Sequence, residues 1–309
     1  MNKALHVGIV VPAFFYVPYL AALENGWYQE LGLDVTFTVL GGIDPVTAAI
    51  KSGQIDIGIG SPEHVIHDVE AGGDLKMIGG NVNRLTHSLI TQPEIKSLKD
   101  LRGKTLGVSA LSGGTSSLFI DILERVGLHY PQDYTIVEAG VVPPRHDKLM
   151  QREIDAGMQT DPHNYMAEDA GLNNLGPVSQ WIPYFQFNSV NIRTSWAEAN
   201  SEALIGFLQA SIKASKWLFE NREASIAIAD KYMQIDRKYL ERAWQDHVTD
   251  EALPSDLRLE RQSIKTALDM MRRDRNAKLA DDAAPEKYVD TRYLAEAQRR
   301  AGVPEQPLK

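Results

Sequence analysis

Residues 96–128 read KSLKDLRGKTLGVSALSGGTSSLFIDILERVGL, and this stretch decides the fold. A charged helical turn leads into a short β-branched strand, which ends in a loop of small residues before an amphipathic helix begins. The N–H groups at the start of such a helix are unpaired, and the helix N-terminus carries roughly +0.5 of an elementary charge. The stretch therefore predicts a binding site for an anionic or strongly polar ligand group. Its candidate residues are Ser112, Gly113, Gly114, Thr115 and Ser116.

Strand-like and helix-like segments alternate on both sides of this stretch. Short apolar runs predict strands at 5–11, 34–40, 55–59, 75–78, 105–109, 134–138 and 154–158. Amphipathic segments predict helices at 15–31, 44–52, 115–127, 144–152 and 161–170, and another that begins at Ser61. This alternation is typical of an α/β fold with mainly parallel sheets whose two faces are covered by helices. From Ala197 onward the pattern is helical, and residues 272–290 are expected to form a loop or a peripheral segment.

Composition excludes several classes of function. The 309 residues suffice for two lobes, and the net charge of −9 argues against binding to a nucleic-acid backbone. Cysteine is absent, which excludes disulfides, thiolate nucleophiles and thiolate metal sites. The sequence contains no phosphate-binding Walker loop, nucleophile elbow or complete dinucleotide fingerprint. No cofactor, no metal and no insertion into a membrane are therefore predicted.

Four short stretches, taken in chain order, resemble one protein family. They are LAALENGWY with LGLDV (20–28 and 31–35), AAIKSGQIDIG (48–58), KDLRGKTLGV (99–108) and IDA (154–156). Together they resemble the periplasmic substrate-binding proteins of ABC importers that take up aliphatic sulfonates, taurine, nitrate or pyrimidine precursors. The resemblance covers about the first two-thirds of the chain, up to about Arg193.

The resemblance implies a fold and a division of the chain. It implies a two-lobed, type II periplasmic-binding-protein-like fold, in which each lobe is a mainly parallel sheet flanked by helices. Residues 1–86 would begin lobe one, residues 87–190 would form lobe two, and residues 191–309 would return to lobe one and add a helical C-terminal extension. Strands at 87–92 and 184–193 would cross between the lobes, and a small ligand would bind in the cleft between them.

The N-terminal segment bears on where the protein works. Met1 to Leu23 is largely apolar, but Pro12 and Pro18 interrupt it and no convincing cleavage site follows, so a signal peptide is not predicted. The resemblance implies a periplasmic protein, whereas the missing signal peptide keeps a cytoplasmic location open.

Further ligand candidates follow from a rule about α/β sheets, in which ligands bind beyond the carboxyl ends of the strands. The aromatics after the first strand are expected to form an apolar wall that suits an aromatic or heterocyclic ligand, although a core position is the alternative for some of them. Gly41 and Gly42 are equally typical of a simple turn, and Ser61 of a helix cap. The full set is Phe14, Phe15, Tyr16, Gly41, Gly42, Ser61, Glu63, Asn83, Gln159 and His163.

Charged and titratable side chains give weaker signals. Arg84, Arg145 and Arg193 could each clamp an acid, but surface arginines are commoner. The histidines at positions 64, 67, 146 and 163 lack the third and fourth partners that a metal site needs. They are interpreted as solvated surface residues, with His163 kept as a ligand candidate.

Two functions from different classes fit this sequence. The first is a solute-binding component that captures a small organic anion or heterocycle and delivers it to an ABC permease. The alternative is a cytosolic enzyme on the same scaffold, a decarboxylase, desulfinase or lyase of an aromatic or heterocyclic acid that uses Glu63, His64 or His163. The binding protein is favoured because the chain offers polar loops but no evident nucleophile or acid–base pair.

Overall fold

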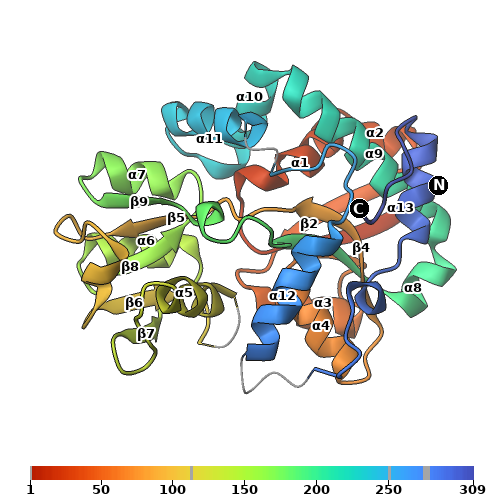
Figure 1. The fold of residues 1–309 in the computed structure, drawn as a ribbon. Helices are drawn as coiled ribbons and strands as arrows, with labels where there is room; N and C mark the ends of the chain where they lie inside the picture. The colour runs from red at the N-terminus through yellow and green to blue at the C-terminus, as the bar shows by residue number, and fades with distance from the viewer. Residues whose placement is uncertain (1, 112–113, 250–251, 274–278) are drawn as a thin grey trace. The chain divides into compact units, whose positions relative to one another are not determined.

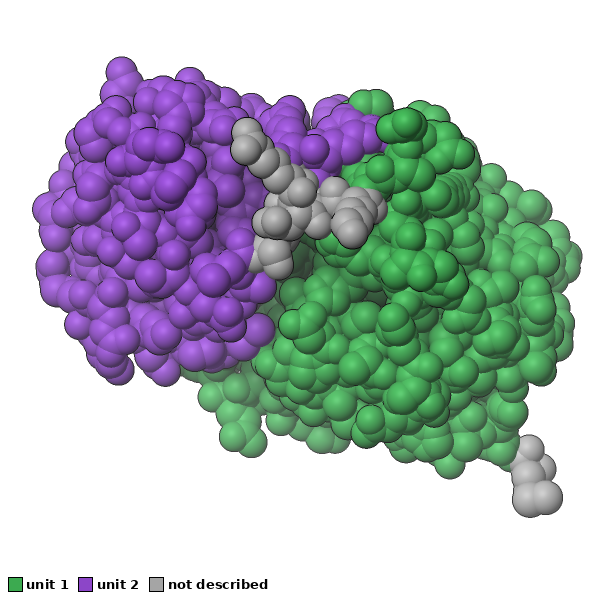
Figure 2. Space-filling model, turned by 90° about the horizontal axis from the view of Figure 1, so that it is seen from below, with its two compact units in different colours: residues 1–84, 185–268, 278–309 green, residues 85–184, 269–277 purple. Residues whose placement is uncertain are grey.

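The computed structural model describes residues 2–111, 114–249, 252–273 and 279–309. The chain divides into two compact units, coloured separately in Figure 2. Unit 1 consists of residues 1–84, 185–268 and 278–309, and unit 2 of residues 85–184 and 269–277. The sequence predicts boundaries at 86/87 and 190/191 and places residues 269–277 in the C-terminal part of lobe one.

Unit 1 is built on a five-stranded mixed sheet with the strand order β2-β1-β3-β10-β4. Strands β1, β2 and β3 run parallel to one another, whereas β10 runs antiparallel to both of its neighbours. The strands are β1 (Lys3–Ile9), β2 (Leu33–Val39), β3 (Ile57–Gly60), β4 (Leu75–Val82) and β10 (Asn188–Arg193).

Helices surround this sheet (Figure 1), and the start of α4 shows how the sequence signals one of them. Ser61 caps the helix that follows β3, and Pro62 occupies its first turn, where the missing N–H costs nothing. The helical segments of unit 1 are η1 (Phe14–Tyr16), α1 (Val17–Glu24), α2 (Trp27–Glu30), α3 (Ile43–Ser52), α4 (Pro62–Glu70), α8 (Thr194–Ala199), α9 (Ser201–Glu220), α10 (Arg222–Met233), α11 (Arg237–Thr249), η4 (Pro285–Tyr288) and α13 (Arg292–Arg300). Helix α12 (Arg261–Arg273) begins in unit 1, and its last residues belong to unit 2.

The core of unit 1 centres on α9, against which α1 and α13 pack. The Phe207 ring of α9 stacks on Tyr28 and Tyr19, with ring centroids 5.3 and 5.9 Å apart. The Tyr28 hydroxyl forms a hydrogen bond of 3.2 Å with Ser211. Buried aromatic rings in offset contact contribute apolar burial and favourable ring geometry, so this cluster anchors α1 and α2 on α9.

Unit 2 repeats the design with the order β7-β6-β8-β5-β9. Here β6, β7 and β8 are parallel, and β5 runs antiparallel to its neighbours, as β10 does in unit 1. The strands are β5 (Ser88–Thr91), β6 (Thr105–Val108), β7 (Thr135–Glu138), β8 (Ala156–Gln159) and β9 (Asn173–Pro177). The helical segments are η2 (Leu98–Leu101), α5 (Gly114–Glu124), α6 (Val142–Met150), α7 (His163–Asp169) and η3 (Val178–Gln180).

The expected α/β fold with two helix-flanked, mainly parallel sheets is confirmed, but two segments differ from expectation. The continuous helix predicted for 15–31 is wrong. Its first residues form the 3-10 turn η1, and Gly26, with a φ of +72°, separates α1 from α2. The left-handed backbone at Gly26 ends α1 because it cannot continue an α-helix. The segment 272–290 contains the end of α12 and the turn η4, while residues 274–278 lie outside the described residues.

Candidate functional site

The three aromatics after β1 lie in the interior of unit 1. Phe14 presents no surface to solvent and stacks on His247, with ring centroids 5.2 Å apart. Phe15 meets Phe187 edge to face at 5.9 Å, and the Tyr16 hydroxyl donates to the Ile59 carbonyl at 3.4 Å. Burial raises the pKa of Tyr16 to about 12, so its hydroxyl keeps its proton. An apolar wall formed by Phe15 and Tyr16 stays a prediction, and Phe14 is the weakest of the three candidates.

The glycine pair after β2 leads into helix α3. Gly41 has a φ of +77°, a left-handed conformation that glycine adopts without strain, and Gly42 is the N-cap of α3. The pair therefore makes the turn that places the first residues of α3 beyond the end of β2. Ligand contact by Gly41 or Gly42 stays a prediction.

The start of α4, beyond the end of β3, combines a helix cap with a buried carboxylate. The Ser61 hydroxyl accepts a hydrogen bond of 3.2 Å from the Glu63 N–H and donates to the Glu63 carboxylate oxygen Oε2. Glu63 is only 7% exposed. Carboxylates in the first turn of a helix are stabilised by the helix dipole, which explains why this one tolerates burial. The second oxygen, Oε1, has no hydrogen-bond donor among the described residues.

Asn83, directly after β4, forms hydrogen bonds within unit 1 through both ends of its side-chain amide. Its Nδ2 donates to the Arg258 carbonyl at 2.7 Å, and its Oδ1 accepts from Gln186 Nε2 at 2.8 Å. Both ends of the amide are therefore used to join β4 to the chain segments around Arg258 and Gln186. A structural role explains Asn83 better than ligand contact does.

The loop that opens α5 in unit 2 is described only in part, because Ser112 and Gly113 lie outside the described residues. Gly114 has a φ of +52°. Thr115 is buried, and its Oγ1 accepts from the Ser109 N–H at 2.9 Å and contacts Ser109 Oγ at 3.1 Å. The Thr115 hydroxyl therefore connects the residue that follows β6 to the first turn of α5. Ser116 is also buried, and anion binding at this helix start stays a prediction.

Gln159, the last residue of β8, is the most telling candidate in unit 2. It has no exposed surface, and neither Oε1 nor Nε2 finds a hydrogen-bond partner among the described residues. Nearby at the same end of the sheet, His146 Nδ1 and Asn164 Oδ1 are also buried without a partner in the described part of the chain. A buried polar atom without a partner costs about 1–3 kcal/mol, so a water molecule or a solute group that pairs with these atoms would be stabilising.

The surface interpretation of the unit 2 histidines is wrong. His146 is only 8% exposed, and its ring lies edge to face with that of His163, with centroids 5.5 Å apart. Burial, reinforced by the neighbouring His146, lowers the pKa of His163 to about 4, and burial also lowers the pKa of His146. Both imidazoles are therefore neutral near pH 7 and offer one donor and one acceptor each. Helices α6 and α7 pack together and enclose them, which the spacing in sequence did not reveal.

The surface interpretation also fails for His64, which lies half-buried on the first turn of α4 and was named in the sequence only as a residue of the alternative enzyme. Its Nδ1 lies 2.9 Å from Thr47 Oγ1 and 3.6 Å from Asp44 Oδ1, both on α3. Burial lowers the pKa of His64, partly offset by the charges of Glu63 and Asp44. His67, three residues along the helix, is exposed as expected. The adjacent Glu63 and His64 were the available signal, because two polar side chains in the first turn after a buried strand lie where ligands bind.

Arg145 is structural. Its side chain is 1% exposed and donates to two main-chain carbonyls, that of Met158 at 2.6 and 3.0 Å and that of Gly140 at 2.8 Å. The guanidinium thereby joins α6 to β8 and to the end of the loop that follows β7. It is not available to clamp an acid.

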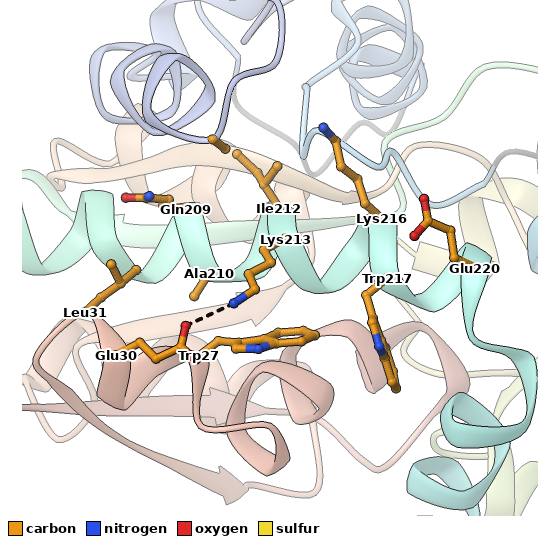
Figure 3. Close-up of a pocket in the computed structure, with 11 residues that line it drawn as sticks. Trp27, Glu30, Leu31, Gln209, Ala210, Ile212, Lys213, Lys216, Trp217 and Glu220 are labelled. Carbon is orange, nitrogen blue, oxygen red and sulfur yellow. Dashed lines mark hydrogen bonds and ion pairs between the residues drawn. The ribbon is translucent and has the colours of Figure 1, made fainter.

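Two pockets on unit 1 lie away from these candidates. One, of about 470 Å³, is lined by Lys3 and Leu33, the first residues of β1 and β2, and therefore lies at the amino ends of the strands. The other, of about 480 Å³, lies between α2 and α9 (Figure 3). There Lys213 reaches across to Glu30 at 3.0 Å and lies over the Trp27 ring. Lys213 and Glu30 thus form a partly exposed ion pair across this pocket.

No group of three or more histidine, cysteine, aspartate or glutamate side chains suited to a metal ion occurs among the described residues. None of the described helices is long and apolar enough to cross a membrane.

Comparison with known proteins identifies the family of this chain and the fold that it shares with solved structures. Residues 14–225 match the family model described as NMT1/THI5 like. A 4-amino-5-hydroxymethyl-2-methylpyrimidine phosphate synthase of Schizosaccharomyces pombe is 28% identical over 147 residues, which are 47% of this chain and 41% of the synthase. The chain thus spans only about two-fifths of that relative. A formylaminopyrimidine-binding protein of Halalkalibacterium halodurans is 24% identical over 228 residues, 71% of this chain and 66% of the relative.

A solved structure extends the likeness over nearly the whole molecule. The ligand-binding component of an ABC-type import system from Staphylococcus aureus matches with a TM-score of 0.79 and 14% identity, covering 96% of this chain and all of that one. At this identity the match establishes the fold, which is the two-lobed fold of periplasmic binding proteins.

Proposed function

The chain belongs to the NMT1/THI5-like family, and from this premise we propose that it is the solute-binding component of an ABC-type importer. Such a protein binds a small molecule without changing it and hands it to a permease. Both candidate regions, Glu63 with His64 in unit 1 and Gln159 with its neighbours in unit 2, lie beyond the carboxyl ends of strands, where α/β sheets bind ligands.

The observation that carries the proposal is the buried amide of Gln159. Its Oε1 and Nε2 have no partner among the described residues, although the side chain is completely buried. Primary amides have two donors and two acceptor sites, so Gln159 suits a solute with both donors and acceptors, such as a heterocycle or an amide. An anionic group would suit the helix start at Gly114–Ser116. The predicted ligand is therefore a small organic anion or heterocycle.

Pyrimidines are the first solutes to test, because one relative is a formylaminopyrimidine-binding protein. Isothermal titration calorimetry with 4-aminopyrimidine derivatives, aliphatic sulfonates and aromatic acids should reveal at least one ligand. The variant Gln159→Leu should weaken its binding at least tenfold, whereas Gln132→Leu, an exposed glutamine of the same unit, should leave binding unchanged. Binding that is insensitive to Gln159→Leu would remove this residue from the site.

An enzyme on the same scaffold is the second candidate, and the likeness to the fission-yeast synthase supports it over 47% of the chain. The two functions differ in the fate of the solute. A binding protein returns the solute unchanged after release by denaturation, so mass spectrometry of the released material decides between them. Recovery of a converted product, made in proportion to time and protein, would refute the binding function.

The same proposal includes a partner and a location. A solute-binding component delivers its ligand to a permease, and the loaded protein should stimulate ATP hydrolysis by that permease in vesicles. Import from outside the cell would place the protein in the periplasm. Fractionation of cells that produce it from its native gene, with immunodetection, tests this, and detection only in the cytoplasm would favour the enzyme.

A further inference from the structure

His64 is held in a fixed orientation between two helices of unit 1. It lies in the first turn of α4, and its Nδ1 points to the first turns of α3, where Thr47 Oγ1 lies at 2.9 Å and Asp44 Oδ1 at 3.6 Å. Both of these atoms are oxygens, and the carboxylate of Asp44 is an acceptor only. Nδ1 is therefore surrounded by acceptors.

The hydroxyl of Thr47 has a second hydrogen-bond partner, the main-chain carbonyl of Ile43. Thr47 Oγ1 donates to the Ile43 carbonyl at 3.0 Å, and a hydroxyl has a single hydrogen to donate. With that hydrogen directed to the Ile43 carbonyl, a proton on His64 Nδ1 makes the 2.9 Å contact with Thr47 Oγ1 a hydrogen bond and also faces Asp44 Oδ1. A neutral imidazole has one proton, so Nε2 is left as an unprotonated acceptor.

The protein leaves this acceptor unused. His64 Nε2 receives no hydrogen bond from any of the described residues, and neither does Glu63 Oε1 on the preceding position of α4. The other oxygen of Glu63 already accepts the Ser61 hydroxyl. Two adjacent residues therefore offer two open acceptors at the carboxyl end of β3.

We propose that His64 is a specificity-determining residue, whose Nε2 accepts a hydrogen bond from an N–H group of the solute. The inference rests on the proposed solute-binding function and narrows the solute class. The solute would present one or two N–H donors to this end of unit 1, as an amino group on a heterocycle, an amidine or a primary amine does. A sulfonate or carboxylate has only acceptor oxygens, so it would be repelled at this position and selected against.

The first test needs no ligand. Long-range proton–nitrogen NMR spectra of the free protein with labelled histidine, assigned by comparison with His64→Asn, report which ring nitrogen carries the proton. The expected result at pH 7.5 is a proton on Nδ1 and a bare Nε2. A proton on Nε2 would overturn the inference whatever the protein binds.

The second test uses two isosteres of His64. In His64→Asn the side-chain amide can keep the hydrogen bond to Thr47 but cannot reach the position of Nε2. In His64→Gln the amide oxygen can take the place of Nε2. The probes are 2-aminopyridine, 2-(dimethylamino)pyridine, which lacks the N–H donors, and benzenesulfonate, all measured by calorimetry.

We expect 2-aminopyridine to bind the wild type at least tenfold more tightly than either other probe. His64→Asn should weaken its binding roughly 10- to 100-fold, because a solute N–H is left without an acceptor, and His64→Gln should restore most of the loss. His67→Asn, the same change on an exposed histidine of α4, is the matched control and should have no effect. Equal binding of the amino and dimethylamino probes, or equal loss in the Asn and Gln variants, overturns the inference and leaves the proposed function standing. Failure of all solutes, those of the larger panel included, would instead overturn the proposed function.

Discussion

His87 should make unit 2 sensitive to mild acid. It is 2% exposed, and burial together with the nearby Arg145 guanidinium lowers its pKa from 6.5 to about 3. The folded state therefore holds His87 neutral, while the unfolded chain binds a proton as soon as the pH falls below about 6.5. Stability is complete above the unfolded pKa and is lost progressively as the pH falls toward the folded pKa.

The size of this effect follows from the two pKa values. At pH 5 an unfolded histidine is almost fully protonated and the folded one is not, so the free energy of unfolding falls by about 2 kcal/mol relative to pH 7.5. The result hardly depends on the folded pKa, provided that it lies more than half a unit below 5.

Urea unfolding followed by far-ultraviolet circular dichroism at pH 7.5 and pH 5 measures the loss. The wild type should lose about 2 kcal/mol more between these pH values than His87→Gln, whose side chain does not titrate. His129→Gln, a change on an exposed histidine of the same unit, is the control and should lose as much as the wild type. An equal loss in the wild type and in His87→Gln would refute the reasoning.

Three further changes should have measurable effects on stability. Arg145→Met leaves two main-chain carbonyls without their buried donor and should cost about 3 kcal/mol in urea unfolding. Gly80→Ala places a Cβ 2.3 Å from the main-chain oxygen of Arg258, which cannot move aside, so it should lower the free energy of unfolding by at least about 2 kcal/mol. Its control, Gly79→Ala, meets only ordinary contacts at 3.6 Å and should lower the free energy of unfolding by less than about 0.5 kcal/mol. Gln159→Leu should raise the melting temperature of the free protein by a few degrees, because it removes two buried polar atoms that lack partners; a lower melting temperature would contradict this.

Much of the fold could be predicted because local patterns and tertiary structure agree here. The strand Thr105–Val108 and the helix after it follow from a β-branched run, a small-residue loop and an amphipathic period, and the structure has β6 and α5 in these places. Where a tertiary constraint overrides the pattern, prediction failed. The apolar period from residue 15 to residue 31 continues through Gly26, but the left-handed backbone there divides the helix.

The candidate site was less predictable, because hydrogen-bond partners lie far apart in the sequence. Asn83 is satisfied by residues more than 100 positions away, which no local motif reveals. His64 depends on Thr47, 17 positions before it, and the orientation of its ring follows only from the packing of α3 against α4. The sequence indicated that the candidate residues lie near the carboxyl ends of strands. It could not show which of their polar atoms form hydrogen bonds within the protein.

Buried polar side chains indicate a binding site only where their atoms lack hydrogen-bond partners within the protein. Arg145 and Asn83 are buried and polar, yet their hydrogen bonds join elements of the fold, so stability alone accounts for them. Gln159 is buried too, but neither polar atom of its amide has a partner among the described residues, and burial of such atoms lowers stability. The free protein gives up folding free energy by keeping Gln159, and a solute that binds there, as we propose, would recover it by supplying the missing partners. Binding should therefore raise the melting temperature of the wild type more than that of Gln159→Leu.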